Sequence, residues 1–457
     1  MKTKFYFTAL LFLGLSTAAN AQAQNQECMT NLSIYVEHAK VKNYDAAYAP
    51  WKMVYDNCPD INWANFAYGE RILKDKIEKS SGADKDGFIN DIMLLWDNSL
   101  KYFPKKASVA SVIIDKTLLK YDNKMADDAE IYEGLGKAMK EDRANFKNPK
   151  ALYLYFSSLV DLHKAGKKDL QEVFNVYDDV TAKVEEEVTV RTNRIAKLLP
   201  KEEDGSLTSK EKKILKADRT NSESFGKIAG SIDSKLGPLA DCENLIPLYQ
   251  RTFEENKGNV EWVKRAVGLM FNKECTDDPM FQKLFEAQLS LDPSADAYVY
   301  GGTLKMKNGD SSGALADFDK ALSLETDNLK KSKIAYKVAV INKRKGSKST
   351  ARKYAQKAID ANSANGRAYL LIANLYASSA NDCGTDTFSK RAIYWKAADL
   401  ARKAGRVDPS ISGTANKSAL SYSERAPSKQ DIFTSGKAGQ TITFSCWVGG
   451  SVKVPSI

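Results

Sequence analysis

The sequence is poor in the residues from which most active sites are built. It has 2 histidines in 457 residues, His38 and His163, and both lie inside predicted helices far apart in the chain. No serine–histidine–aspartate or cysteine–histidine arrangement can be assembled around them. The run GSKS at 346–349 matches the end of a phosphate-binding loop, but it lacks the preceding strand and the first glycine. We therefore expect no enzyme and no cofactor, with a catalytic pair of carboxylates as the alternative that remains.

Long apolar runs are also missing, except at the N-terminus. Lys2 and Lys4 precede an apolar run at 5–15, and small residues follow. This order is typical of a secretory signal, so we assign 1–23 to a signal peptide. The run is too short for the alternative, a membrane anchor, and Cys28 does not follow the small-residue box of a lipoprotein. No later segment approaches the ~18 apolar residues of a membrane span, which predicts an exported chain without a transmembrane segment.

The six cysteines show no CxxC motif and no cluster with histidine, so we expect no metal site. In the oxidising compartment that export implies, an even count predicts disulfides. Cys28 begins the first predicted helix and Cys58 ends the second, and antiparallel neighbours bring those ends to one pole. The same argument joins Cys242, which begins one predicted helix, to Cys275, which ends the next. The remaining two cysteines are Cys383, in an inserted loop, and Cys446, in the tail. The predicted disulfides are Cys28–Cys58, Cys242–Cys275 and Cys383–Cys446.

The clearest pattern in the sequence lies at 298–326. Two short helices are predicted there, separated by an Asn-Gly-Asp turn. In the second helix Ala314, Phe318 and Ala321 are spaced four and then three apart, so they line one face. Gly302 in the first helix would let a neighbouring helix approach closely. The segment is therefore predicted to be a helical hairpin.

This hairpin recurs along the chain. The alanine spacing returns 37 residues later, in 351–358, and a third copy extends from Tyr369 to Pro409 with about twelve inserted residues that carry Cys383. Looser copies occur near 47–59 and 96–104. A hairpin that recurs at this period is typical of a helical repeat protein, whose core grows along one axis.

The residues of the hairpin resemble the tetratricopeptide repeat (TPR) signature, in the run Tyr298, Gly302, Gly309, Ala314, Phe318 and Ala321. The chain departs from that signature at Gly301, Lys305 and Thr326. The resemblance covers 241–409 well and 28–104 loosely. It implies an all-α, TPR-like helical-hairpin solenoid that binds other proteins. By analogy with exported repeat proteins of this build, it also implies a Gram-negative bacterium and a periplasmic, cell-surface or secreted location.

Composition divides the rest of the chain. Residues 24–169 are predicted to form N-terminal helical repeats, 170–240 a charged bridge of extended helices, and 241–411 the TPR-like domain. Residues 412–457 are predicted to be a linker rich in Ser, Gly and Lys, followed by a β-like tail docked on the last repeats. A secretion-sorting domain is the alternative for this tail.

One stretch of the bridge, at 204–211, matches half of an EF-hand calcium loop. Pro200 and Glu202 stand where two of the ligands should be, so we favour a helix start that is capped by Thr208 and Glu211.

We predict a scaffold that binds a protein or peptide of the cell envelope through a groove. The net charge of +10 is spread along helices, so nucleic acid is not an expected partner. The alternative is a glycan- or small-ligand-binding envelope protein that uses exposed aromatics such as Trp395 and Trp447. The predicted groove residues, some of which could instead belong to the core, are Tyr298, Lys305, Tyr336, Lys337, Lys343, Tyr369 and Tyr376.

Overall fold

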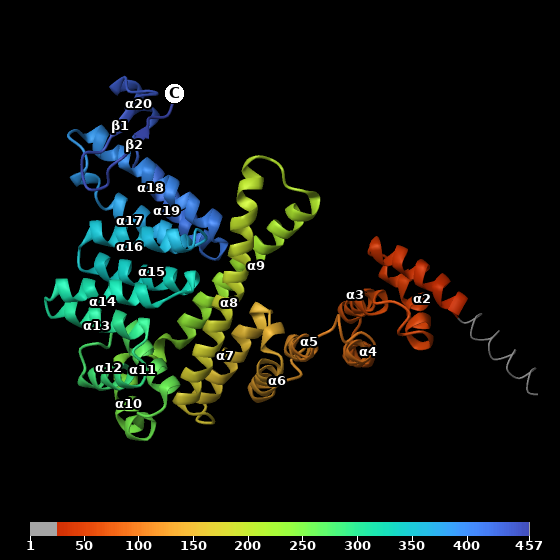
Figure 1. The fold of residues 1–457 in the computed structure, drawn as a ribbon. Coiled ribbons are helices and arrows are strands. Elements are labelled where there is room, and N and C mark those ends of the chain that lie inside the picture. The colour runs from red at the N-terminus through yellow and green to blue at the C-terminus, as the bar shows by residue number, and fades with distance from the viewer. Residues whose placement is uncertain (1–24, 457) are drawn as a thin grey trace, which may run out of the picture. The chain divides into compact units, whose positions relative to one another are not determined.

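The computed structural model describes residues 25–456, so the predicted signal peptide at 1–23 lies outside it. The fold is almost entirely helical (Figure 1). Its contacts divide the chain into two compact units, Met1–Leu162 and His163–Ile457. Within the described residues no helix is both long and apolar enough to cross a membrane.

Unit 1 is a succession of helices whose core surrounds Trp51. The indole Nε1 of Trp51 donates to the backbone oxygen of Asn65 at 2.8 Å, and the Tyr35 hydroxyl donates to Asn65 Oδ1 at 2.7 Å. Gly69 is required beside them, because a Cβ there would lie 2.6 Å from Trp51 Nε1. Residues 25–40 are helical, and the following elements are α2 (Tyr44–Asn57), α3 (Ala64–Lys79), α4 (Gly82–Tyr102), α5 (Val109–Asp122), α6 (Asp128–Glu141), η1 (Arg143–Asn145) and α7 (Pro149–Lys164).

Unit 2 begins with two long helices and continues as a stack of helical hairpins. The stack comprises α10 (Cys242–Asn256), α11 (Val260–Asn272), α12 (Pro279–Leu291), α13 (Ala295–Lys307), α14 (Ser311–Leu324), α15 (Asn328–Arg344), α16 (Lys348–Ala361), α17 (Gly366–Ala377) and α18 (Thr387–Val407). Sequential helices pack together most extensively as α13 with α14, α15 with α16, and α17 with α18. These pairs confirm the predicted all-α, TPR-like solenoid.

The hairpins close on small residues, as the spacing predicts. A Cβ at Gly302 would lie 2.6 Å from Phe318 Cε1 and 3.0 Å from the oxygen of Ala314. α13 and α14 can therefore pack this closely only because residue 302 has no side chain. The turns after α13 and α15 contain Gly309 and Gly346, with φ of +90° and +78°. Glycine adopts this left-handed backbone without the steric cost that other residues carry.

The charged segment forms α8 (Leu170–Glu203) and α9 (Ser209–Leu236). The predicted cap at its turn is confirmed: the Glu211 amide donates to Thr208 Oγ1, and the Thr208 amide donates to a Glu211 carboxylate oxygen. α8 is joined by ion pairs to three helices of the stack. They are Asp179–Arg265 on α11 at 3.1 Å, Glu185–Lys333 on α15 at 2.8 Å, and Glu203–Arg406 on α18 at 3.6 Å. α8 therefore runs along the edge of the repeats.

The predicted linker after residue 412 is wrong, because most of this stretch is helical. It forms α19 (Ser412–Arg425) and α20 (Lys429–Ser435). Ala415 and Ala419 are one turn apart and buried, and α19 packs against α18. Ser428 and Asp431 cap the start of α20. Packing of small side chains thus outweighs a composition that is typical of loops.

The predicted β-like tail is present and docked on the last repeats. Strands β1 (Thr441–Thr443) and β2 (Ser451–Lys453) pair antiparallel, with Thr441 opposite Lys453. Phe444 and Val448 are buried in the core cluster of the stack. The described residues contain three disulfides, joined as predicted, with Cα–Cα distances of 6.4 Å for Cys28–Cys58, 5.5 Å for Cys242–Cys275 and 5.1 Å for Cys383–Cys446.

Candidate binding surfaces

The first surface is the one predicted from the sequence, on α13, α15 and α17. Tyr298 and Tyr336 are half-buried and pack against the core cluster, and burial raises the pKa of Tyr336. Lys343 is exposed near the end of α15. These residues lie on α13 and α15 and are at least partly accessible.

Four of the predicted groove residues already have partners inside the fold. Lys305 pairs with Asp317 at 2.8 Å, and Lys337 pairs with Asp296 at 2.9 Å. Tyr369 and Tyr376 are only 7% and 6% exposed and belong to the core cluster. These two tyrosines are therefore core residues, which was the alternative given for the groove positions.

The second surface is a groove in unit 1, which we call the α4–α6 groove. It has a volume of about 540 Å³ and is lined by side chains from three successive helices. The apolar residues of its lining are Met93, Leu100, Val109, Val112 and Ile113, and the charged ones are Asp97, Lys116, Lys120, Glu130, Lys137 and Glu141. Gly134, which also lines the groove, approaches Thr117 so closely that a Cβ would lie 2.8 Å from its hydroxyl. Val109 at the groove is 40% exposed.

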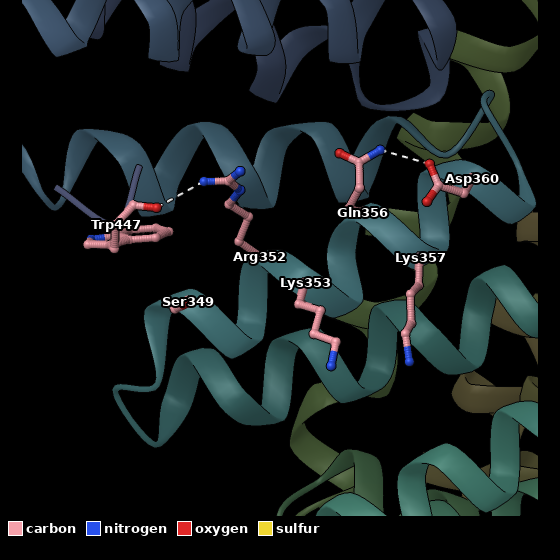
Figure 2. A pocket seen from close by; sticks show the side chains of 7 residues that line it. All are labelled: Ser349, Arg352, Lys353, Gln356, Lys357, Asp360 and Trp447. Carbon is pink, nitrogen blue, oxygen red and sulfur yellow. Dashed lines mark hydrogen bonds between the residues drawn. The ribbon is translucent and has the colours of Figure 1, made fainter. Parts of the chain in front are cut away.

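The third surface is a hollow of about 480 Å³ between α16 and the tail, which we call the α16–tail hollow. Figure 2 shows its lining residues arranged along one face of α16, with Trp447 of the tail at one end. The α16 residues are spaced three and one apart alternately, which keeps them on one side of the helix. They are Ser349, Arg352, Lys353, Gln356, Lys357 and Asp360.

The tail is held in place by hydrogen bonds that positively charged side chains of the repeats donate to its backbone oxygens. Arg352 Nη1 donates to the backbone oxygens of Trp447 at 3.0 Å and Val448 at 2.6 Å, and Lys396 Nζ donates to that of Gly449 at 2.8 Å. The Trp447 ring packs on Tyr376 with centroids 5.9 Å apart, and its Nε1 donates to Ser379 Oγ at 3.2 Å.

Positive charge in the hollow is only partly balanced. Lys357 pairs with Asp319 at 2.8 Å. Among the described residues no carboxylate forms an ion pair with Arg352, Lys353 or Lys396. Burial, and then the charge of Arg352, lower the pKa of the Lys396 ammonium. An added anion would therefore be attracted to this hollow.

Within residues 25–456 no group of three or more His, Cys, Asp and Glu side chains could hold a metal ion. His163 Nδ1 lies 2.8 Å from the backbone oxygen of Lys168, just beyond the end of its own helix. The α4–α6 groove offers apolar contact, and the α16–tail hollow offers positive charge.

The α4–α6 groove and the α16–tail hollow were not predicted from the sequence, although Trp447 was named there. A signal for the α16–tail hollow was present, because Arg352, Lys353 and Lys357 recur at helical spacing on one face. The α4–α6 groove gave no such signal, because its lining comes from three helices whose relative positions only the fold determines.

The chain matches no known family profile and no curated protein. Solved structures similar to it include a tetratricopeptide repeat protein from Parabacteroides merdae, at 13% identity and a TM-score of 0.25, covering 68% of this chain and 97% of that one. Yeast Tom70 matches at 11% identity and a TM-score of 0.30, covering 90% and 96%. The Cut9–Hcn1 assembly of the APC/C matches at 10% identity and a TM-score of 0.26, covering 85% and 95%. Because these TM-scores are below 0.5, the TPR-like fold is assigned from the chain's own helix pairs.

Proposed function

We propose that the chain is an exported, non-enzymatic interaction scaffold that binds a protein or peptide of the cell envelope of a Gram-negative bacterium. The observation that carries this proposal is the α4–α6 groove. A lining that combines apolar and charged side chains has the composition of a protein-binding surface. The apolar side chains would contact apolar groups of an extended or helical segment, and the charged ones would set its orientation.

The predicted surface on α13 and α15 would add contacts to the same kind of partner. Tyr298, Tyr336 and Lys343 are the residues there that have accessible area and lack an ion pair in the described part of the chain. Tyrosine is enriched at protein interfaces, because it provides a large apolar surface with one polar group.

The test is site-specific photo-crosslinking in intact cells. A photoreactive residue at Val109, in the groove, should capture one envelope protein. The same residue at Leu94, which is 54% exposed on α4 but does not line the groove, is the matched control. In the purified chain, V109D should weaken partner binding about tenfold, because a charge replaces buried apolar contact. L94D should leave binding unchanged. Equal capture from both positions would show that the groove is not the binding site.

A second candidate function is favoured by one observation, which is that Trp447 lines the positively charged α16–tail hollow. Aromatic rings beside polar groups are suited to a glycan or small ligand.

A further inference from the structure

We propose that the α16–tail hollow binds an anionic saccharide, with its carboxylate or sulfate groups at the cationic side chains of α16 and its ring against Trp447. This inference rests on the second candidate function above and is independent of the α4–α6 groove, which lies in the other unit. Three features of the hollow carry it: its charge, its lining and its construction.

The charge selects an anion. Three cationic side chains and one carboxylate line the hollow, and Lys357 is the cation that has an ion-pair partner. Arg352 is hydrogen-bonded to neutral carbonyl oxygens, and Lys353 is exposed. Figure 2 shows the Arg352 and Lys353 side chains pointing away from each other. A guanidinium provides directed donors and an ammonium provides a point charge, so each can bind a separate carboxylate or sulfate group of the ligand.

The lining favours a sugar over a peptide. Apart from Trp447, every lining side chain is polar or charged, so apolar contact in the hollow is limited to the indole and to the methylene groups of the arginine and the lysines. Ser349, Gln356 and Asp360 offer hydroxyl, amide and carboxylate groups to sugar hydroxyls, and Gln356 already donates to Asp360 at 2.8 Å. A flat indole presents the apolar face that a pyranose ring can cover.

The hollow is also fixed in shape. Trp447 follows Cys446, which is bonded to Cys383, and its backbone oxygen accepts from Arg352. The aromatic wall is thus held in place before any ligand arrives, by a disulfide to the loop between α17 and α18 and by hydrogen bonds from α16. Preorganisation of this kind reduces the entropy lost on binding.

The experiment is calorimetric titration of the full disulfide-bonded chain at low salt, with trigalacturonate and a sulfated disaccharide as probes of the two anionic groups. The methyl ester of trigalacturonate is the matched neutral ligand, and hexaglutamate tests an acidic peptide. We expect at least one anionic saccharide to bind at least tenfold more tightly than the neutral ester and hexaglutamate, and to weaken as salt is raised.

Variants locate the site. Lys353→Gln removes an exposed charge that has no ion-pair partner in the described chain, and it should weaken saccharide binding about fivefold. Trp447→Ala should weaken it about tenfold through lost apolar contact. Lys417→Gln, on exposed α19, is the charge-matched control and should have no effect.

Three results would overturn the proposal. The first is the absence of saccharide binding to the folded wild-type chain. The second is equal binding of the acid and its ester. The third is tighter binding of hexaglutamate that K353Q abolishes, which would assign the hollow to an acidic peptide. Since V109D lies in unit 1, it should leave saccharide binding unchanged, so the groove and hollow proposals can fail separately.

Discussion

Substitution of two glycines in α9 would test how the α8–α9 hairpin docks on the end of the stack. A Cβ at Gly226 would lie 1.9 Å from the backbone oxygen of Ser410, 2.6 Å from its carbonyl carbon and 2.8 Å from its Cα. Ser410 belongs to η4 (Pro409–Ile411), which packs against α9. The obstructing atoms are backbone, so no side chain can rotate away. Either α9 or η4 would have to move by roughly 1.5 Å.

Gly230 lies one turn later in the same helix and has no atom within 4 Å of its Cβ position. Glycine to alanine in an open helical position stabilises by up to about 1 kcal/mol. At Gly226 the same gain is opposed by an overpacking cost of about 1–3 kcal/mol. Gly230→Ala should therefore raise stability, whereas Gly226→Ala should lower it or leave it well below that of Gly230→Ala.

The assay is urea unfolding followed by circular dichroism, with hydrogen exchange of α9 and η4 to localise the change. Faster exchange in both elements is expected for Gly226→Ala alone. If Gly226→Ala proved as stable as Gly230→Ala, the close contact between α9 and η4 would not exist in solution, and the docking of the hairpin would be refuted.

Three further predictions concern single features. Asn65→Ala should destabilise unit 1 by about 2–3 kcal/mol in urea unfolding, because it leaves the buried Tyr35 hydroxyl without its partner; a loss below 0.5 kcal/mol would contradict this. Replacing Cys383 and Cys446 with serine removes a link between residues 63 apart, which the chain-entropy model values at about 4 kcal/mol. Hydrogen exchange in the tail should then rise. Unchanged exchange would show that the hydrogen bonds alone hold the tail in place. Burial, and then the charge of a nearby glutamate, raise the pKa of Asp115 to about 6, above its unfolded value. Unit 1 should therefore lose up to about 2 kcal/mol as pH rises from 4 to 7. Asp115→Asn should abolish that slope, and a slope that persisted in this variant would assign it to another group.

The repeat architecture was predictable because its determinants are local. Gly302, Ala314, Phe318 and Ala321 specify a close helix pair within thirty residues of chain, and the turn glycines mark its ends. The pairs Cys28–Cys58 and Cys242–Cys275 followed from helix polarity, since cysteines at the appropriate ends of antiparallel helices share a pole, and Cys383–Cys446 was the pair that remained. Neither inference needs to know how distant repeats are arranged.

The parts that sequence did not predict depend on contacts between distant segments. Tyr376 was expected to be open, but the tail places Trp447 against it from 71 positions away in the chain. Likewise, the α16–tail hollow joins Arg352 to a carbonyl 95 residues later. α19 was missed because its serines, its glycine and its asparagine are typical of loops, and only the contact with α18 makes Ala415 and Ala419 a packing face.

The ion pairs of α8 have a consequence for the evolution of the chain. Asp179 and Glu203 are separated by about 36 Å of helix, at 1.5 Å per residue, and they reach α11 and α18 respectively. Repeat stacks ordinarily gain or lose hairpins with little penalty, since each hairpin contacts only its neighbours. Here a duplicated hairpin between α11 and α18 would shift one end of the stack away from its partners on α8, unless α8 lengthened by a matching number of turns. The length of α8 and the number of hairpins between α11 and α18 are therefore coupled wherever these ion pairs are kept.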